Sequence, residues 1–242
     1  DADWRSGKTW GLVYYAGEEH TGFLKNAHNM FFSENGLSPL AFPSLKTFEN
    51  EVIAMTARML GGGEEVSGTM TSGGTESILM AMKAYRQLAR ATMPSVKEPE
   101  ILLPVTAHPA FEKAAHYFDL KTVHAPVGND FKADVRAAKA LITDNTIVIV
   151  GSAPAYPHGV IDPIPELAAI AEEHKIGFHV DSCLGGFMLP WLNKLGYPVT
   201  PFDFSVPGVT SISADVHKYG YAAKGASVVL YRSKELRRRE FF

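Results

Sequence analysis

The amino-acid sequence predicts an α/β protein built on a mostly parallel sheet of seven strands, with helices on both faces. Seven short runs rich in apolar and β-branched residues are typical of strands. They lie at residues 68–71, 101–103, 122–124, 146–151, 177–181, 211–215 and 227–231. Stretches with helical periodicity separate most of these runs, and strands that alternate with helices favour a parallel sheet covered on both sides.

The expected helices are recognised by apolar residues that recur every three or four positions. They cover residues 45–60, 75–91, 109–118, 134–142 and 165–174. The first helix carries an apolar stripe composed of Phe48, Val52, Met55 and Met59. The second is expected to bury Ile78, Met82, Tyr85 and Ala89.

Composition and charge exclude several classes of function. The net charge of −3 at pH 7 provides no broad basic surface, so nucleic acid is not an expected partner. No run of about 18 apolar residues occurs, so no membrane span is expected. Cys183 is the single cysteine and the first ten residues carry no apolar signal segment, which favours a cytoplasmic, reducing compartment.

Two regions are expected in the chain. Residues 45–242 contain all the predicted strands and form the large domain. Residues 1–44 are predicted to be an extended lead-in that packs on the large domain or on another subunit, because they hold too many aromatic rings for a solvated tail. These rings belong to Trp4, Trp10, Tyr14, Tyr15, Phe23, Phe31, Phe32 and Phe42.

A glycine turn joins the first predicted strand to the helix at residues 75–91. Gly73, Gly74 and Thr75 stand where the helix begins. Backbone N–H groups at a helix N-terminus bind anions, and glycines let a phosphate approach the backbone closely. The turn is therefore either a phosphate site or a plain strand-to-helix connection.

Asp181 ends the apolar strand 177–181, and ligands bind at the carboxyl ends of strands in open α/β sheets. His179 alternates to the same face of the strand. Two other interpretations remain open for Asp181: a helix cap, or half of a His-x-Asp metal pair. A third ligand with suitable spacing is lacking, so no metal is expected.

Lys218 follows the strand 211–215, where a lysine is either a surface charge or a positioned amine. If it lies at the crevice with Asp181 and the glycine turn, one site holds an amine, an acid and an anion site. Pyridoxal phosphate needs these three elements: a lysine for the Schiff base, an acid for the pyridinium nitrogen and a phosphate site. His108 follows the strand 101–103 and is either a residue that stacks on the cofactor ring or a polar residue at a helix start.

Four segments carry a resemblance to a known family. They are TSGGTESILMA at 71–81, HGVIDPIPE at 158–166, HVDSCLGGF at 179–187 and GVTSISADVHKYGYAAKG at 208–225. With them, most of residues 40–242 resembles the large domain of fold-type I pyridoxal-phosphate enzymes of the group II decarboxylase family. The resemblance implies pyridoxal 5′-phosphate as cofactor, Lys218 as the Schiff-base lysine, Asp181 as the pyridinium partner and His108 as the stacking base. The phosphate contacts that it implies are Gly73, Gly74, Thr75 and His217.

Within that family, the motifs are most similar to those of carbon–carbon lyases that cleave phosphorylated sphingoid bases. This similarity implies substrate contacts from Lys224, from Tyr14 or Tyr15, and from Asn35. Two departures affect the substrate-phosphate contacts. Ser38 stands where the family has a histidine, and Ala223 stands where it has a proline.

The resemblance implies a retro-aldol cleavage that yields a long-chain aldehyde and phosphoethanolamine. It also implies a homodimer whose active sites are built from both subunits, and a C-terminal small domain that these 242 residues do not include. The chain is then a fragment or acts with a second polypeptide. Two other functions remain open: an amino-acid decarboxylase of the same family, or a non-catalytic module that binds a phosphate ligand or serves in assembly.

Overall fold

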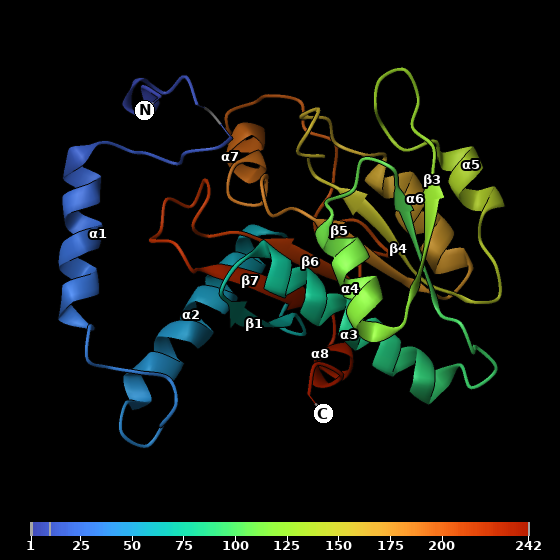
Figure 1. The fold of residues 1–242 in the computed structure, drawn as a ribbon, viewed down its shortest axis with the longest axis horizontal. Coiled ribbons are helices and arrows are strands. Elements are labelled where there is room, and N and C mark those ends of the chain that lie inside the picture. Colours follow the sequence, from blue (N-terminus) through green and yellow to red (C-terminus); the bar gives the residue numbers. More distant parts are fainter. Residues whose placement is uncertain (1, 10, 242) are drawn as a thin grey trace.

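The computed structural model describes residues 2–9 and 11–241, and it contains one seven-stranded sheet in the order β1-β7-β6-β5-β4-β2-β3 (Figure 1). The strands are β1 (Ser67–Thr71), β2 (Glu100–Pro104), β3 (Lys121–Ala125), β4 (Thr146–Ser152), β5 (Gly177–Asp181), β6 (Ser211–Ala214) and β7 (Ser227–Tyr231). Strand β7 pairs antiparallel with β1 and with β6, and the remaining pairs are parallel. The prediction of a mostly parallel α/β sheet is confirmed.

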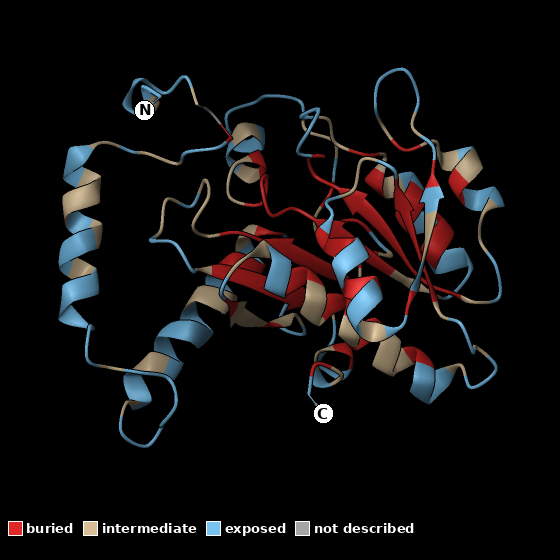
Figure 2. Cartoon of the chain, in the orientation of Figure 1, coloured by how far each residue is buried: buried red, intermediate tan, exposed pale blue. Residues whose placement is uncertain are grey.

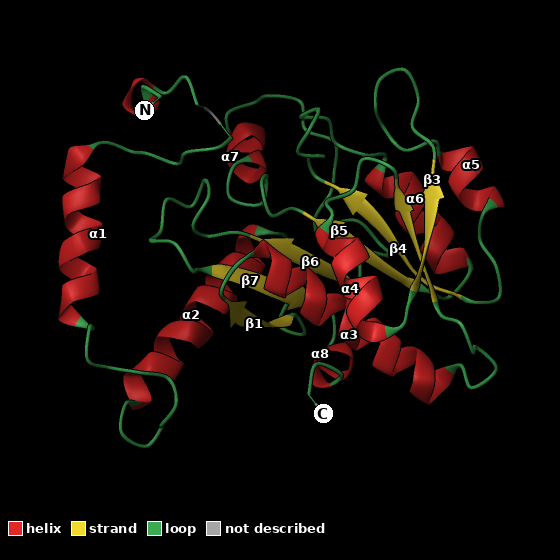
Figure 3. Cartoon of the chain, viewed as in Figure 1, coloured by secondary structure: helices red, strands yellow, loops and turns green. Residues whose placement is uncertain are grey.

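Helices cover both faces of the sheet (Figure 3). One face packs against α3 (Gly74–Thr92), α4 (Ala110–Phe118) and α8 (Lys234–Arg238). The other packs against α2 (Pro43–Met59), α5 (Val135–Ala140) and α6 (Ile164–Glu173). The short helix α7 (Leu189–Lys194) follows the loop after β5, and it was not predicted.

Two hydrophobic cores result from the alternation of side chains along each strand. In β4, Ile149 enters the core beside α6, whereas Val148 and Val150 enter the core beside α3. In β5, Phe178 and Val180 fill the α6 side. His179 and Asp181, which alternate with them, therefore face α3. The side chain of Asp181, the last residue of the strand, thus lies on the same side of the sheet as the glycine turn.

The lead-in is not wholly extended, which corrects the prediction for residues 1–44. It contains a 3₁₀ turn at Trp4–Ser6 and a 13-residue helix, α1 (Glu18–Met30). Figure 2 shows α1 as exposed and partly exposed along its whole length, apart from the sheet. Trp10, one of the aromatic residues counted above, lies outside the described residues.

Helix α2 exposes part of its apolar stripe. Phe48 is 46% exposed and Met55 is 53% exposed, whereas Val52 and Met59 pack against the core. The residues of α2 that are fully buried are Thr56 and Ala57. Among the described helices, none combines the length and apolar character that a membrane span requires.

Candidate active site

A cavity of about 600 Å³ lies at the carboxyl-terminal edge of the sheet. The loops that follow β1, β2, β4, β5 and β6 all line it, because these strands run in the same direction and end at one edge. The predicted residues that line it are Tyr14, Gly73, Gly74, Thr75, His108, Asp181, His217 and Lys218. The sequence-based prediction of one crevice that holds an amine, an acid and a glycine turn is met.

The glycine turn brings the N-terminus of the 19-residue helix α3 to the cavity. Ser72 strengthens the start of the helix, because its backbone N–H and hydroxyl both donate to a Glu76 carboxylate oxygen at 2.6 Å. At Gly74, a Cβ atom would lie 2.7 Å from Cys183 Sγ and 2.9 Å from Asp215 Oδ2. Glycine is thus required at position 74 by the protein's own packing, in addition to any approach of a ligand.

Asp181 is the last residue of β5 and is 8% exposed. Its Oδ1 accepts hydrogen bonds from the backbone N–H of Cys183 at 3.1 Å and from Ser213 Oγ at 3.4 Å. The next helix, α7, begins only at Leu189, so Asp181 does not cap a helix. Across residues 2–9 and 11–241, no cluster of three potential metal ligands occurs.

His179 lies behind Asp181 in a buried polar chain between β5, β6 and α3. Its Nδ1 is 2.7 Å from Ser211 Oγ, and its Nε2 is 3.3 Å from Ser213 Oγ. Ser211 Oγ is also 2.5 Å from the hydroxyl of Tyr85 on α3. Burial lowers the pKa of His179 to about 3, so the imidazole is neutral. This histidine supports the end of the strand from within the core.

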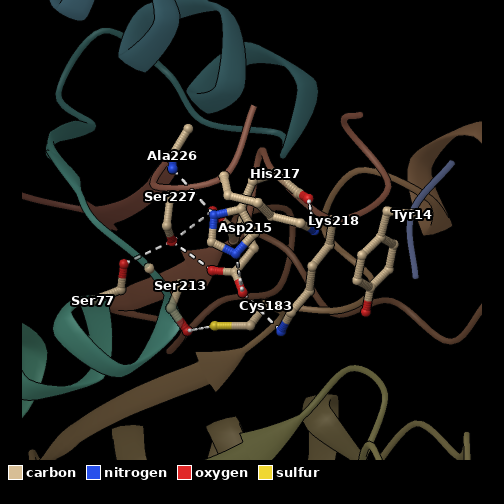
Figure 4. A network of polar contacts seen from close by, with 12 residues as sticks. Tyr14, Ser77, Cys183, Ser213, Asp215, His217, Lys218, Ala226 and Ser227 are labelled. Carbon is tan, nitrogen blue, oxygen red and sulfur yellow. Dashed lines mark hydrogen bonds and ion pairs between the residues drawn. The ribbon is translucent and has the colours of Figure 1, made fainter. Parts of the chain in front are cut away.

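Lys218 is bound by a carboxylate that sequence reasoning did not single out. Its Nζ lies 2.7 Å from Asp215 Oδ2, and Asp215 is 2% exposed (Figure 4). Burial by itself lowers the pKa of Lys218, but the carboxylates of Asp215 and Asp181 act in the opposite direction and raise it. The net pKa is raised, so the amine is held as an ammonium ion. The sequence did contain a signal for this contact: Asp215 precedes Lys218 by three positions at the end of a predicted strand.

His217 lies between the glycine turn and the loop before β7. A Cβ at Gly73 would be 3.6 Å from His217 Cε1, and His217 Nδ1 accepts a hydrogen bond from the Ala226 N–H at 3.1 Å. Burial lowers the pKa of His217, and the positive charges of Lys224 and Lys218 act in the same direction.

His108 is the polar residue at a helix start that one of its two interpretations predicted, and it also faces the cavity. It lines the cavity, and its Nδ1 accepts a hydrogen bond from the Ala110 N–H at 3.1 Å at the start of α4. Because Nδ1 is the acceptor, a neutral His108 carries its proton on Nε2. The same contact that begins the helix therefore sets the orientation of the ring at the cavity.

The predicted substrate residues are only partly brought together. Tyr14 lines the cavity, whereas the hydroxyl of Tyr15 donates to Glu18 at 2.8 Å on the surface. Lys224 Nζ lies 4.6 Å from the centre of the Tyr14 ring at the rim. Asn35 does not line the cavity; it is in the loop between α1 and α2, where its Oδ1 accepts from the Leu37 N–H at 3.1 Å.

Tyr156 was also missed by sequence reasoning. It lines the cavity from the loop after β4, two residues before the motif that begins at His158. Its position next to a recognised motif was the only signal that the sequence contained.

The donor set of the cavity fits pyridoxal phosphate. Lys218 supplies an amine, Asp181 a buried carboxylate, and the N-terminus of α3 with its glycines an anion site. The fold and the site together define the large domain of a pyridoxal-phosphate-dependent enzyme of fold type I. The family profile described as "Pyridoxal-dependent decarboxylase conserved domain" matches residues 13–242, and the chain belongs to this family.

Within this family, the chain is strongly similar to proteins named as sphingosine-1-phosphate lyases. Sphingosine-1-phosphate lyase 1 of Rattus norvegicus is 51% identical over 243 residues, which cover 100% of this chain and 42% of that protein. Sphingosine-1-phosphate lyase of Oryza sativa is 50% identical over 249 residues, covering 100% of this chain and 46% of the relative. The chain thus spans less than half the length of these curated relatives.

Solved structures agree with this result. The sphingosine-1-phosphate lyase of Burkholderia pseudomallei superposes with a TM-score of 0.95 at 44% identity, over 99% of this chain and 56% of that one. A glutamate decarboxylase from Lactobacillus brevis has a TM-score of 0.79 at 26% identity, over 92% of this chain and 52% of that one. The large domain is therefore shared with amino-acid decarboxylases.

Proposed function

We propose that this chain carries the cofactor-binding site of a pyridoxal-phosphate-dependent lyase that cleaves a phosphorylated sphingoid base. The products are a long-chain aldehyde and phosphoethanolamine. One observation carries the proposal: two proteins named sphingosine-1-phosphate lyase are about half identical to the whole of this chain, every cavity-lining segment included.

The cavity residues have distinct roles in this proposal. Lys218 would hold the cofactor covalently, and the Asp181 carboxylate would pair with the ring nitrogen. The N-terminus of α3 and His217 would hold the phosphate, and His108 would stack on the ring. When bound, pyridoxal phosphate withdraws electrons from the bond that breaks.

Proton transfer needs groups that line the cavity. The substrate hydroxyl gives up its proton as the carbon–carbon bond breaks, so a base must be within hydrogen-bond reach. Three groups of the cavity are suited to hold or move a proton: the amine of Lys218 and the hydroxyls of Tyr14 and Tyr156. Burial raises the pKa of Tyr14, which keeps its hydroxyl protonated and able to donate.

The phosphate of the substrate is assigned to Lys224. Its ammonium lies 4.6 Å from the centre of the ring of Tyr14, which lines the cavity. An amino-acid decarboxylase would instead need a cation for the substrate carboxylate. Ser38 stands where the family has a histidine, so the chain lacks one basic group that could otherwise share this contact with Lys224.

The test combines a spectrum with a turnover assay. We expect the protein reconstituted with pyridoxal phosphate to show a visible absorption band that borohydride removes, with the label mapping to Lys218. It should release aldehyde from a phosphorylated sphingoid base and no carbon dioxide from glutamate or aromatic amino acids. Carbon dioxide release would support the decarboxylase instead. A colourless protein that borohydride does not change would support the non-catalytic module.

We further propose that the active protein is a homodimer. Apolar side chains of the lead-in and of α2 are exposed in the single chain, among them Phe23, Phe32, Phe48 and Met55. A second copy is the occupant that the family resemblance implies, and aromatic residues are enriched in such interfaces. Asn35 lies away from its own chain's cavity and would serve the partner's site.

Light scattering of the intact protein at micromolar concentration tests the dimer directly. Deletion of residues 1–20 removes Tyr14 and Tyr15, and we expect it to weaken both dimerisation and turnover. A monomer that still turns over substrate would exclude the shared site.

A further inference from the structure

The ion pair between Lys218 and Asp215 lies at the cavity, and its carboxylate is anchored in a buried network of hydroxyl groups. One oxygen of Asp215 accepts from the lysine ammonium at 2.7 Å, and the other accepts from Ser227 Oγ at 2.6 Å. Ser227 Oγ is 2.9 Å from Ser77 Oγ, which is 2.6 Å from Thr71 Oγ1 (Figure 4). These hydroxyls form a chain that ends on the carboxylate, which fixes the orientation of Asp215.

The backbone around this carboxylate is shaped to receive it. The N–H of Lys218 donates to the backbone oxygen of Asp215 at 3.2 Å, so the chain turns and directs the lysine back toward the aspartate. On the opposite side, a Cβ at Gly74 would lie 2.9 Å and 3.0 Å from the two carboxylate oxygens. A side chain at position 74 would therefore displace the carboxylate.

The location of Asp215 is unfavourable for binding an anion. It lies against the first residue of α3, where the helix N-terminus attracts negative charge and where the cofactor phosphate is assigned. A carboxylate at this point repels a phosphate and weakens its binding. Two basic side chains lie near the same carboxylate oxygen: the Lys218 ammonium at 2.7 Å and His217 Nε2 at 3.9 Å, of which the lysine is the hydrogen-bonded partner.

We propose that Asp215 is the positioning residue for Lys218: it holds the lysine ammonium at the floor of the cavity whenever the lysine is not joined to the cofactor. The inference rests on the proposed attachment of the cofactor to Lys218. Joining the amine to an aldehyde forms a carbon–nitrogen double bond and releases one water, and the ammonium must first give up a proton. The ion pair thus determines both the position of Lys218 Nζ and its protonation state before it reacts.

Other charged groups face Lys218 and must be considered in any pH dependence. Asp181 and Cys183 lie on the β5 side, and Lys218 also acts on the pKa of Tyr14, His217 and Lys224. Burial raises the pKa of the Cys183 thiol well above its usual range, so it is neutral near pH 7. Only Asp215 forms an ion pair with Lys218 among the described residues.

The test measures covalent labelling of Lys218 in the cofactor-free protein across a range of pH. The probe is pyridoxal without its phosphate, trapped by borohydride and quantified on the Lys218 peptide, so that repulsion of a phosphate by Asp215 does not contribute. In Asp215→Asn we expect labelling to be about tenfold faster than in the unaltered protein at pH values where the ammonium predominates. The midpoint of the pH profile should move to lower pH.

Ser227→Ala is the matched control, because it removes a hydrogen bond to Asp215 and keeps the charge. Its profile should stay close to that of the unaltered protein. If Asp215→Asn does not fold, as judged by circular dichroism, Asp215→Ser replaces it with a smaller polar side chain. Labelling of Lys218 with the same pH profile in the aspartate variant would overturn the inference alone. Absence of label on Lys218 in the unaltered protein would overturn the proposed cofactor attachment as well.

Discussion

The ammonium of Lys224 lies 4.6 Å from the centre of the Tyr14 ring, and it also donates to the backbone oxygen of His217 at 3.1 Å. The contact joins the lead-in to the loop that follows Lys218, and a cation over an aromatic face is attractive. Two segments far apart in the sequence thus form one rim of the cavity. At this rim the ammonium of Lys224 is held by an aromatic face and a backbone oxygen.

Lys224→Met should raise the KM for a phosphorylated sphingoid base by about tenfold or more, since a hydrogen-bonded charge pair with the substrate phosphate is lost. The visible band of the bound cofactor should remain, because the variant leaves Lys218 and Asp181 in place. Steady-state kinetics and a spectrum of the same preparation check both parts. Lys224→Arg, which keeps the charge, is the control. An unchanged KM in the methionine variant would remove Lys224 from substrate binding.

Lys218→Ala should abolish the visible band that borohydride removes, because no other amine is held at the floor of the cavity by a buried carboxylate among the described residues. The fold should persist, since Lys218 is at the cavity surface and is not part of either hydrophobic core. Absorption spectra and thermal unfolding are the measurements. Lys224→Ala should keep the band, and a reducible cofactor in Lys218→Ala would show that another lysine forms the bond.

Asp181→Asn should retain bound cofactor but lower turnover by about 100-fold, because an amide does not stabilise a protonated ring nitrogen as a carboxylate does. Turnover and cofactor content, measured on the same sample, separate the two effects. The melting temperature is needed alongside, since Asp181 also accepts hydrogen bonds from Cys183 and Ser213. Near-normal turnover at full cofactor occupancy would exclude the assigned role.

Gly74→Ala should destabilise the cofactor-free protein by about 1–3 kcal/mol, the usual cost of an extra methyl group in a packed site. The new Cβ would lie 2.7 Å from Cys183 Sγ and would press on the Asp215 carboxylate. Gly73→Ala is the matched control, because its Cβ would be in ordinary contact with His217 at 3.6 Å and its φ of 166° is extended backbone. Urea unfolding of both variants is the measurement, and equal losses would contradict the packing argument.

His179 should make the protein less stable as the pH falls. Its pKa is about 3 in the folded state and 6.5 at its ordinary value, so below pH 6.5 the unfolded chain takes up a proton that the folded chain does not. The stability contributed by neutral His179 is fully present above about pH 6.5, and it declines toward pH 3 by about 1 kcal/mol per pH unit.

Urea unfolding at pH 7 and pH 5 checks this dependence. In His179→Gln, the difference between the two free energies of unfolding should be smaller than in the unaltered protein. The comparison between variants removes the contributions of other titrating groups, apart from Asp181, which is linked to His179 through Ser213. An identical difference in both proteins would show that His179 does not titrate on unfolding.

Much of the fold could be predicted from the sequence because its strands and helices differ in period. Strands such as β4 are short apolar runs, and α3 repeats its buried residues at helical spacing, so local patterns were sufficient. Helix α1 was missed because it contains Gly22 and buries none of its residues, which leaves no clear apolar stripe.

The sequence by itself determined that the glycine turn, Asp181, His108 and Lys218 share one site. They follow strands that a parallel sheet must end at the same edge, so their order along the chain is sufficient to bring them together. Tertiary structure alone decided the finer contacts. Tyr14 faces the cavity, whereas Tyr15 lies on the surface. The turn after β6 brings Lys218 into an ion pair with Asp215. Such choices depend on the direction of each side chain, which the packing of distant segments determines.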